Sequence, residues 1–139
     1  MICDLELTEY VEIRMSLPFG EVKKILGGAA VGIHTMEDEH FGISVVEMLA
    51  AGLVVIAHNS AGPKEDILVG AEKEFGFLAD SLDDYSQLFE RVVGDFMDKD
   101  KRGNQIKMIE AGQDWCLRNF TNESCEKNVL SCIKKLLFV

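Results

Sequence analysis

Glu39 and Glu47 are the strongest candidates for chemistry, because seven residues separate them where a polar loop enters an apolar helix. Glu47 falls a little over one turn inside that helix, in a turn whose other residues are apolar. A carboxylate there must find a hydrogen-bond donor or stay solvated, because burying an unpaired charge costs free energy. Ribose and hexose hydroxyls are suitable donors, so the pair is suited to binding a sugar. The alternative is that Glu47 pairs with a Lys or Arg of the same domain.

Gly42 marks the start of the expected helix, and this position favours an anion. The amides of a first helical turn have no partner within the helix, and the helix dipole points its positive end toward the loop. A diphosphate would be stabilised there, and a glycine lets it approach the backbone closely. The alternative is that Gly42 simply ends the loop.

The three histidines lie near the same region. His34 ends an expected strand, so it is a candidate either to contact a polar ligand or to make a structural hydrogen bond to the loop. His40 is a helix cap or a site residue, and His58 is predicted to be structural. No combination of His, Cys, Asp and Glu has the spacing of a metal site, so we predict no metal and no other cofactor.

The elements that must position these residues alternate between strand and helix. Expected strands cover residues 10–15, 29–33, 53–57 and 76–79, and expected helices cover about 19–26, 42–51, 63–68, 81–97, 101–118 and 121–137. This alternation predicts an α/β fold, with a Rossmann-like parallel sheet, helices on both faces and a helical tail. Ligands of such folds bind at the carboxyl ends of the strands.

The length of 139 residues predicts one domain, and no repeat, linker or low-complexity tract divides it. We expect a Rossmann-like core over residues 1–95 and terminal helices over 96–139. A hydrophobic fraction of 47% and a charged fraction of 27% are typical of a folded soluble protein.

The charge and the cysteines restrict the partners. A formal net charge of −10 repels nucleic acid and anionic lipid, and no apolar run approaches the ~20 residues of a membrane-spanning helix. The first residues do not resemble a signal peptide. Cys3, Cys116, Cys125 and Cys132 lack the paired spacing of a zinc or redox motif, which favours reduced thiols. We therefore expect this chain to be soluble and cytosolic, with no nucleic acid partner and no membrane contact of its own.

The run EHFGISVVEMLAAG over residues 39–52, followed by residues 54–63, resembles the signature of retaining glycosyltransferases of the large sucrose-synthase-like family, with its E-x7-E motif. Residues 32–36, 57–60 and 62–66 are most similar to its eukaryotic mannosyltransferases, which move mannose from GDP-mannose to a dolichol-linked oligosaccharide in an α-1,2 linkage. The similarity runs from about residue 7 to residue 93.

The resemblance implies a role for each matching residue. Glu39 would act in catalysis by contacting hydroxyls of the transferred mannose, and Glu47 would contact the ribose. The nucleobase would lie near Arg14 and Ser16. Backbone amides of Phe41, Gly42 and Ile43 would bind the diphosphate. His40 and His34, which are candidates from the residues alone, complete the predicted donor-binding set. The implied reaction retains the anomeric configuration, and the enzyme stabilises the departing diphosphate and an oxocarbenium-like centre.

The resemblance also implies that this chain is the C-terminal, nucleotide-sugar-binding half of a GT-B enzyme. The acceptor domain and the membrane contact would lie outside it, and the full-length enzyme would work at the cytosolic face of the endoplasmic reticulum membrane. Two basic residues that neutralise the diphosphate in the family would lie upstream, so we expect no sugar transfer by the chain alone. Ala61 stands where the family usually has Gly.

Two other functions compete with this interpretation. One is a catalytically incomplete binding or regulatory module derived from such an enzyme. The other is a dinucleotide oxidoreductase, which is disfavoured because no G-x-G-x-x-G follows a strand; Gly27 and Gly28 precede a strand instead.

Overall fold

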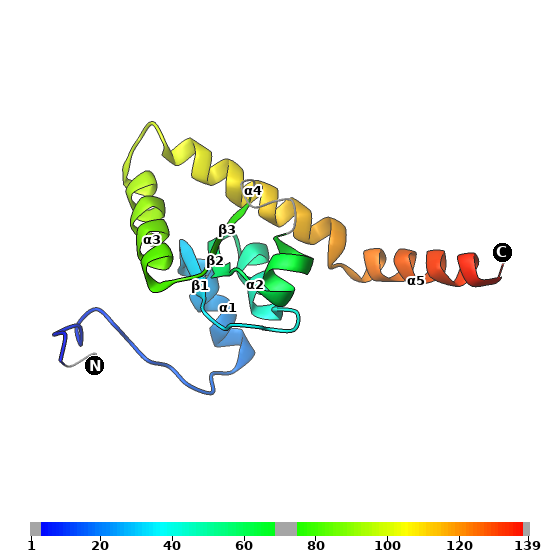
Figure 1. The fold of residues 1–139 in the computed structure, drawn as a ribbon, viewed down its shortest axis with the longest axis horizontal. Coiled ribbons are helices and arrows are strands. Elements are labelled where there is room, and N and C mark those ends of the chain that lie inside the picture. Colours follow the sequence, from blue (N-terminus) through cyan, green and yellow to red (C-terminus); the bar gives the residue numbers. More distant parts are fainter. Residues whose placement is uncertain (1–3, 69–74, 138–139) are drawn as a thin grey trace.

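The computed structural model describes residues 4–68 and 75–137, and its strands form one parallel sheet (Figure 1). The strands lie side by side in chain order: β1 (Val31–His34), β2 (Val54–His58) and β3 (Gly76–Ala79). Each lies within about two residues of the strand that the sequence predicts for it. Because the strands are parallel, their carboxyl ends meet at one edge of the sheet.

The helices also follow the prediction. They are α1 (Phe19–Gly28), α2 (Ile43–Ala51), the short π-helix η1 (Pro63–Ile67), α3 (Leu82–Met97), α4 (Arg102–Asn119) and α5 (Asn122–Leu137). The first precedes β1, α2 links β1 to β2, and η1 lies between β2 and β3. The remaining three helices follow β3 and complete the described chain.

β2 divides the hydrophobic core in two, because alternate residues of a strand point to opposite faces of the sheet. Val55 and Ala57 pack with residues of α2 and α4. Val54 and Ile56 pack with Val92 of α3 and with residues of β3. All four β2 residues are 0% exposed. α2 and α3 lie on opposite sides of the sheet (Figure 1), which confirms the predicted α/β fold with helices on both faces.

Local sequence explains where two of the helices begin. α3 starts with a capping box, in which Ser81 Oγ accepts the Asp84 amide at 3.2 Å and the Asp84 carboxylate accepts the Ser81 amide at 2.9 Å. The Ser81 hydroxyl also donates to Asp84 Oδ2 at 2.8 Å, and this bond, followed by those from the Ser81 and Asp80 amides, holds the pKa of the Asp84 carboxyl below its ordinary value. α2 lies between Gly42 and Gly52, whose φ angles of 97° and 87° favour glycine.

α4 packs on the core and α5 projects from it. In α4, Gly112 and Cys116 are buried; a Cβ at Gly112 would lie 3.2 Å from Leu49 Cδ2 of α2. Burial raises the pKa of the Cys116 thiol to about 11, so this thiol stays protonated. α5 extends away from the body as the predicted helical tail (Figure 1). Across the described helices, none has the length and apolar content needed to cross a membrane.

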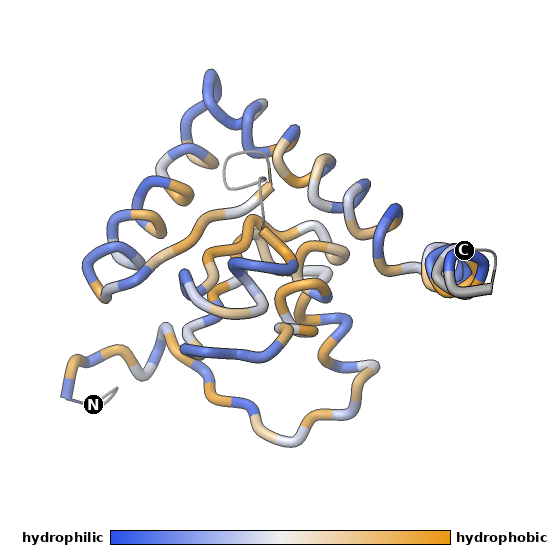
Figure 2. The backbone as a smooth tube through the Cα atoms, turned by 45° about the vertical axis from the view of Figure 1, so that its right-hand side comes forward, coloured by the Kyte–Doolittle hydropathy of each residue, from blue (hydrophilic) through white to orange (hydrophobic). Residues whose placement is uncertain are grey.

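The prediction of a strand over residues 10–15 is wrong. Residues 11–18 have no regular secondary structure, and the segment lies away from the sheet (Figure 1). The segment carries several hydrophobic residues (Figure 2), of which Tyr10 and Met15 are each 82% exposed. Alternating hydrophobicity allows a strand, but a strand also needs a hydrogen-bonding partner, and this segment pairs with none of the three strands described.

Candidate functional site

Two loops meet at the carboxyl edge of the sheet, where β1 and β2 end side by side. The Asp38 amide of the first loop donates to Ser60 Oγ of the second at 2.9 Å. The Gly62 amide donates in the other direction, to the Glu39 carbonyl oxygen, also at 2.9 Å. A Cβ at Gly62 would lie only 2.2 Å from the Phe41 carbonyl oxygen. The loop after β2 therefore fixes the backbone that carries Glu39.

Glu39 lies beside His34, which the sequence also predicted as a site residue. Glu39 Oε2 is 3.9 Å from His34 Nε2, and the His34 side chain is only 10% exposed. His34 Nδ1 has no hydrogen-bond partner among the described residues, whereas the His34 carbonyl accepts the Tyr85 hydroxyl at 2.8 Å. The structure therefore brings a carboxylate and a largely buried imidazole together at the edge where ligands bind in such folds.

Glu47 lies on α2, where it lines a cavity together with residues of α1. It is half-buried, and the other residues that line this cavity of about 390 Å³ are Phe19, Lys23, Leu26, Gly27, Ala50 and Ala51. Within the described residues, Glu47 forms no ion pair with Lys or Arg, so the alternative that it pairs inside the domain is not supported there. Its carboxylate remains available to hydroxyl donors. The sequence did not indicate that residues of α1 would line the same cavity as Glu47.

The start of α2 offers free backbone donors. In the described chain, the amides of Ile43 and Ser44 donate to no backbone carbonyl, as expected for a first helical turn. Gly42 is buried, and a Cβ there would lie 3.3 Å from both Pro63 and Ile67 side chains. This close packing and the left-handed φ explain why glycine stands at this position.

Phe41 makes an aromatic contact with Phe120, the residue that follows α4. Its ring meets that of Phe120 with centroids 5.7 Å apart and planes at 74°, an edge-to-face arrangement. The ring is thus partly engaged with the protein, and the residue stays 37% exposed.

The other predicted site residues lie apart from this group or make other contacts. His40 is exposed in the first loop. Arg14 and Ser16 lie in the exposed segment before α1, where Arg14 Nε is 2.7 Å from Glu12 Oε1. Arg14 lines a hollow together with Val22 and Ile25 of α1, separate from the cavity that holds Glu47.

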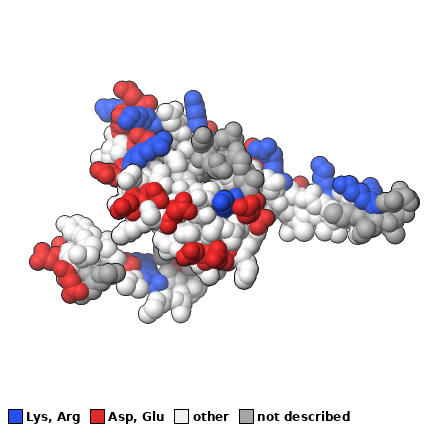
Figure 3. All heavy atoms as spheres, viewed as in Figure 1, with Lys and Arg blue, Asp and Glu red and all other residues white. Residues whose placement is uncertain are grey.

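Acidic residues dominate the surface near the two loops (Figure 3). Residues 37–39 are all acidic, and η1 carries Glu65 and Asp66 beside one basic residue, Lys64. Such a surface repels a diphosphate, which the first-turn amides of α2 would have to offset. In residues 4–68 and 75–137, no group of three or more His, Cys, Asp and Glu side chains could hold a metal ion.

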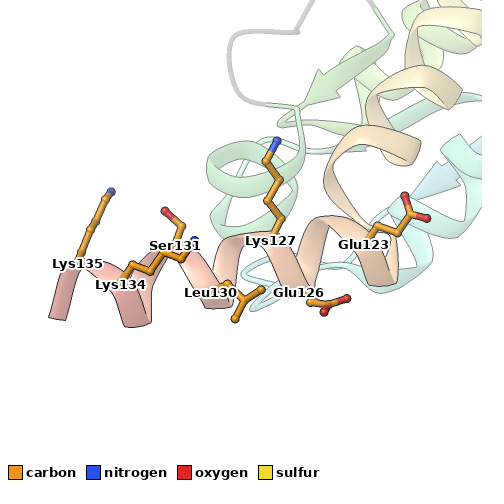
Figure 4. A pocket seen from close by; sticks show the side chains of 7 residues that line it. All are labelled: Glu123, Glu126, Lys127, Leu130, Ser131, Lys134 and Lys135. Atoms are coloured by element: carbon orange, nitrogen blue, oxygen red, sulfur yellow. The ribbon is translucent and has the colours of Figure 1, made fainter. Parts of the chain in front are cut away.

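A second hollow, of about 520 Å³, lies along α5 (Figure 4). All its lining residues come from that one helix: Glu123, Glu126, Lys127, Leu130, Ser131, Lys134 and Lys135. Their side chains spread outward along an exposed surface and do not converge on a common point (Figure 4). A hollow of this kind does not enclose a ligand, so it is not a candidate site.

The loop after β2 contains a strained residue. Ala61 has a φ of 40°, in the left-handed region that favours glycine. We expect Ala61→Gly to raise the free energy of unfolding by about 0.5 kcal/mol, because relief of the strain exceeds the extra chain entropy of glycine. Urea denaturation measures this change. The control is Ala51→Gly in α2, which should lower the free energy by about 1 kcal/mol; a loss of that size at residue 61 would show that Ala61 is unstrained.

Comparisons with known proteins agree with this geometry. The model of the family described as glycosyl transferases group 1 matches residues 1–115. The human GDP-Man:Man(3)GlcNAc(2)-PP-Dol alpha-1,2-mannosyltransferase is 42% identical over 134 residues, covering 96% of this chain and 26% of the relative. The Xenopus laevis protein of the same name is 49% identical over 89 residues, covering 63% of this chain and 18% of the relative. This chain thus spans about a quarter or less of these relatives.

A solved structure supports the fold. The crystal structure of a glycosyltransferase from Rickettsia africae matches with a TM-score of 0.77 and 22% sequence identity. The match covers 99% of this chain and 35% of that one. At this identity the likeness shows a shared fold.

Proposed function

Because the chain belongs to the glycosyl transferases group 1 family, we propose that it is the nucleotide-sugar-binding part of a mannosyltransferase. The donor is GDP-mannose and the acceptor is a dolichol-linked oligosaccharide, joined through an α-1,2 linkage with retention at the anomeric carbon. The observation that carries the proposal is the meeting of Glu39, His34 and the free first-turn amides of α2 at one sheet edge.

Each group at this edge has a role in the proposal. Glu39 accepts hydrogen bonds from hydroxyls of the mannose, and the nearby imidazole of His34 holds the carboxylate in place or adds a donor. The backbone at Phe41, Gly42 and Ile43 binds the diphosphate, and His40 lies in the same loop. Because the leaving diphosphate gains charge in the transition state, amide donors aimed at it accelerate transfer.

Glu47 and α1 bind the nucleoside. The Glu47 carboxylate accepts hydrogen bonds from the ribose hydroxyls, in the cavity that Phe19 and Lys23 also line. Arg14 and Ser16 precede α1, so we place the nucleobase near this end of the helix. No step in this scheme uses a metal or another cofactor.

We assign the other functions of a mannosyltransferase to the part of the relatives that this chain does not cover. This chain corresponds to about a quarter of the human relative. We propose that the remainder provides the acceptor domain, the membrane contact at the cytosolic face of the endoplasmic reticulum, and cations for the diphosphate.

An NMR titration of the 15N-labelled chain with GDP-mannose, UDP-glucose and GDP tests the proposal. We expect selective shifts with the two guanine ligands, since NMR detects millimolar affinities. Glu47→Ala should weaken GDP-mannose binding roughly 10- to 100-fold, because a hydrogen bond to a charged group contributes about 1.5–3 kcal/mol.

The matched control is Glu90→Ala, which removes an exposed carboxylate of α3 and should leave the affinity unchanged. If a folded chain showed no shifts with any ligand, or if Glu47→Ala bound GDP-mannose as tightly as the wild type, the proposed donor site would be wrong.

A further inference from the structure

The backbone on both sides of Glu39 depends on the loop after β2. The Asp38 amide, one residue before it, donates to Ser60 Oγ at 2.9 Å. The Glu39 carbonyl oxygen accepts the Gly62 amide at 2.9 Å. Asp38 itself has a φ of 53°, an unfavourable angle for a residue with a side chain, so the loop needs such bonds to keep its shape.

His58 determines the direction in which the Ser60 hydroxyl donates its hydrogen bond. His58 Nδ1 lies 2.8 Å from Ser60 Oγ. The hydroxyl oxygen already accepts the Asp38 amide, and its one proton needs an acceptor. Within the described residues, His58 Nδ1 is the acceptor in reach. The network is therefore satisfied when Ser60 donates to Nδ1 and the neutral imidazole carries its proton on Nε2.

β2, the central strand of the sheet, supports this arrangement. His58 is the last residue of β2 and pairs in register with Ala79 of β3. The four residues before it are fully buried, so the imidazole stands at the end of the buried central strand of the sheet. A chain of two hydrogen bonds then leads from β2 through Ser60 to the Asp38 amide.

We propose that His58 and Ser60 are positioning residues for Glu39. The imidazole orients the Ser60 hydroxyl, the hydroxyl fixes the Asp38 amide, and the fixed loop presents Glu39 to the donor. His34 touches the Glu39 carboxylate itself, whereas His58 and Ser60 act only through the backbone. The inference rests on the proposed function, because it takes the bound ligand to be a sugar nucleotide.

The test uses the 139-residue chain, with Ser60→Ala compared to Ser60→Thr, which keeps the hydroxyl. Three quantities are measured: hydrogen exchange at the Asp38 amide, the 15N shifts that report the His58 tautomer, and the dissociation constant for GDP-mannose. In Ser60→Ala we expect exchange at Asp38 to rise about 10-fold, the preference for the Nε2-protonated tautomer to disappear, and donor binding to weaken about 10-fold. Ser60→Thr should match the wild type in all three.

His58→Phe provides a second variant, because it keeps a ring at the end of β2 and removes Nδ1. It should also raise exchange at Asp38, while exchange at Ile56 stays slow and shows that the sheet is intact. The inference is overturned if Ser60→Ala changes neither the His58 tautomer nor exchange at Asp38, or if it loosens the loop and donor binding stays at the wild-type level. A wild-type chain that binds no donor contradicts the proposed function, and the exchange and tautomer measurements then still decide whether His58 and Ser60 hold the loop.

Discussion

Replacing Gly62 with alanine is expected to lower the free energy of unfolding by about 3 kcal/mol, because the loop after β2 passes too close to Phe41 to admit a methyl group. A Cβ at Gly62 would lie 2.2 Å from the Phe41 carbonyl oxygen and 2.3 Å from its Cα. These are backbone atoms, which cannot rotate away as a flexible side chain can. The φ of Gly62 is −55°, so any residue could adopt its backbone conformation and the expected cost is purely steric.

Urea denaturation followed by Trp115 fluorescence measures this loss, since Trp115 is half-buried against Phe75 and Phe120. The matched control is Gly94→Ala in α3, where a Cβ meets nothing within 4 Å. It should raise the free energy of unfolding by up to about 1 kcal/mol, because alanine favours a helix. Similar effects of the two substitutions would show that the two loops are not in close contact in solution.

The same substitution should also affect the site. Separating the loops would break the bond from the Gly62 amide to the Glu39 carbonyl, and it would move the backbone next to Gly42. We therefore expect a folded Gly62→Ala chain to bind GDP-mannose more weakly than the wild type. Stability and ligand binding are linked here because one glycine serves both the packing of the loops and the position of Glu39.

The sequence predicted most of the fold because its signals are local. A capping box at Ser81 and Asp84, a proline at the start of η1 and a glycine at each end of α2 determine boundaries within a few residues of chain. The apolar run of β2 is equally clear, since residues 54–57 are buried from both faces of the sheet. Signals of this kind act over short distances, and the structure confirms them.

The mistaken strand over residues 10–15 shows the limit of such signals. Its alternation is genuine, but whether a segment joins a sheet depends on a partner elsewhere in the chain. In the structure the segment stays outside the three-stranded sheet, and its Arg14 pairs with Glu12 two residues away. Sequence reasoning had no means of finding a partner strand.

The loop of the candidate site was predicted from the sequence, but the contacts between its two loops were not. The spacing of Glu39 and Glu47, together with the strand before them, correctly indicated a loop at the carboxyl edge. Ser60 was not singled out, because its bond to Asp38 spans 22 residues and depends on how two loops pack. His58 was predicted to be structural, and its partner became visible only in the folded chain.

The position of Ile56 at the centre of β2 leads to the other large expected effect. Ile56→Ala should lower the free energy of unfolding by about 3–4 kcal/mol, because the side chain is 0% exposed and its loss leaves a cavity between the sheet and α3. The matched control is Ile33→Ala. Ile33 is the register neighbour of Ile56 on β1, yet it is 46% exposed, since β1 lies at the edge of the sheet.

Ile33→Ala should cost about 1 kcal/mol, because its removal opens no enclosed cavity and exposes less new apolar surface. Urea denaturation of both variants gives the two free energies of unfolding. The dependence of each free energy on urea concentration should equal that of the wild type, so that the values can be compared directly. Equal losses would mean that Ile33 is as well covered in solution as Ile56, which would require further chain or a second molecule on the free side of β1. A large loss at Ile56 alone would show that β2, the strand from which His58 and the loop to Gly62 extend, contributes more to the free energy of unfolding than β1 does.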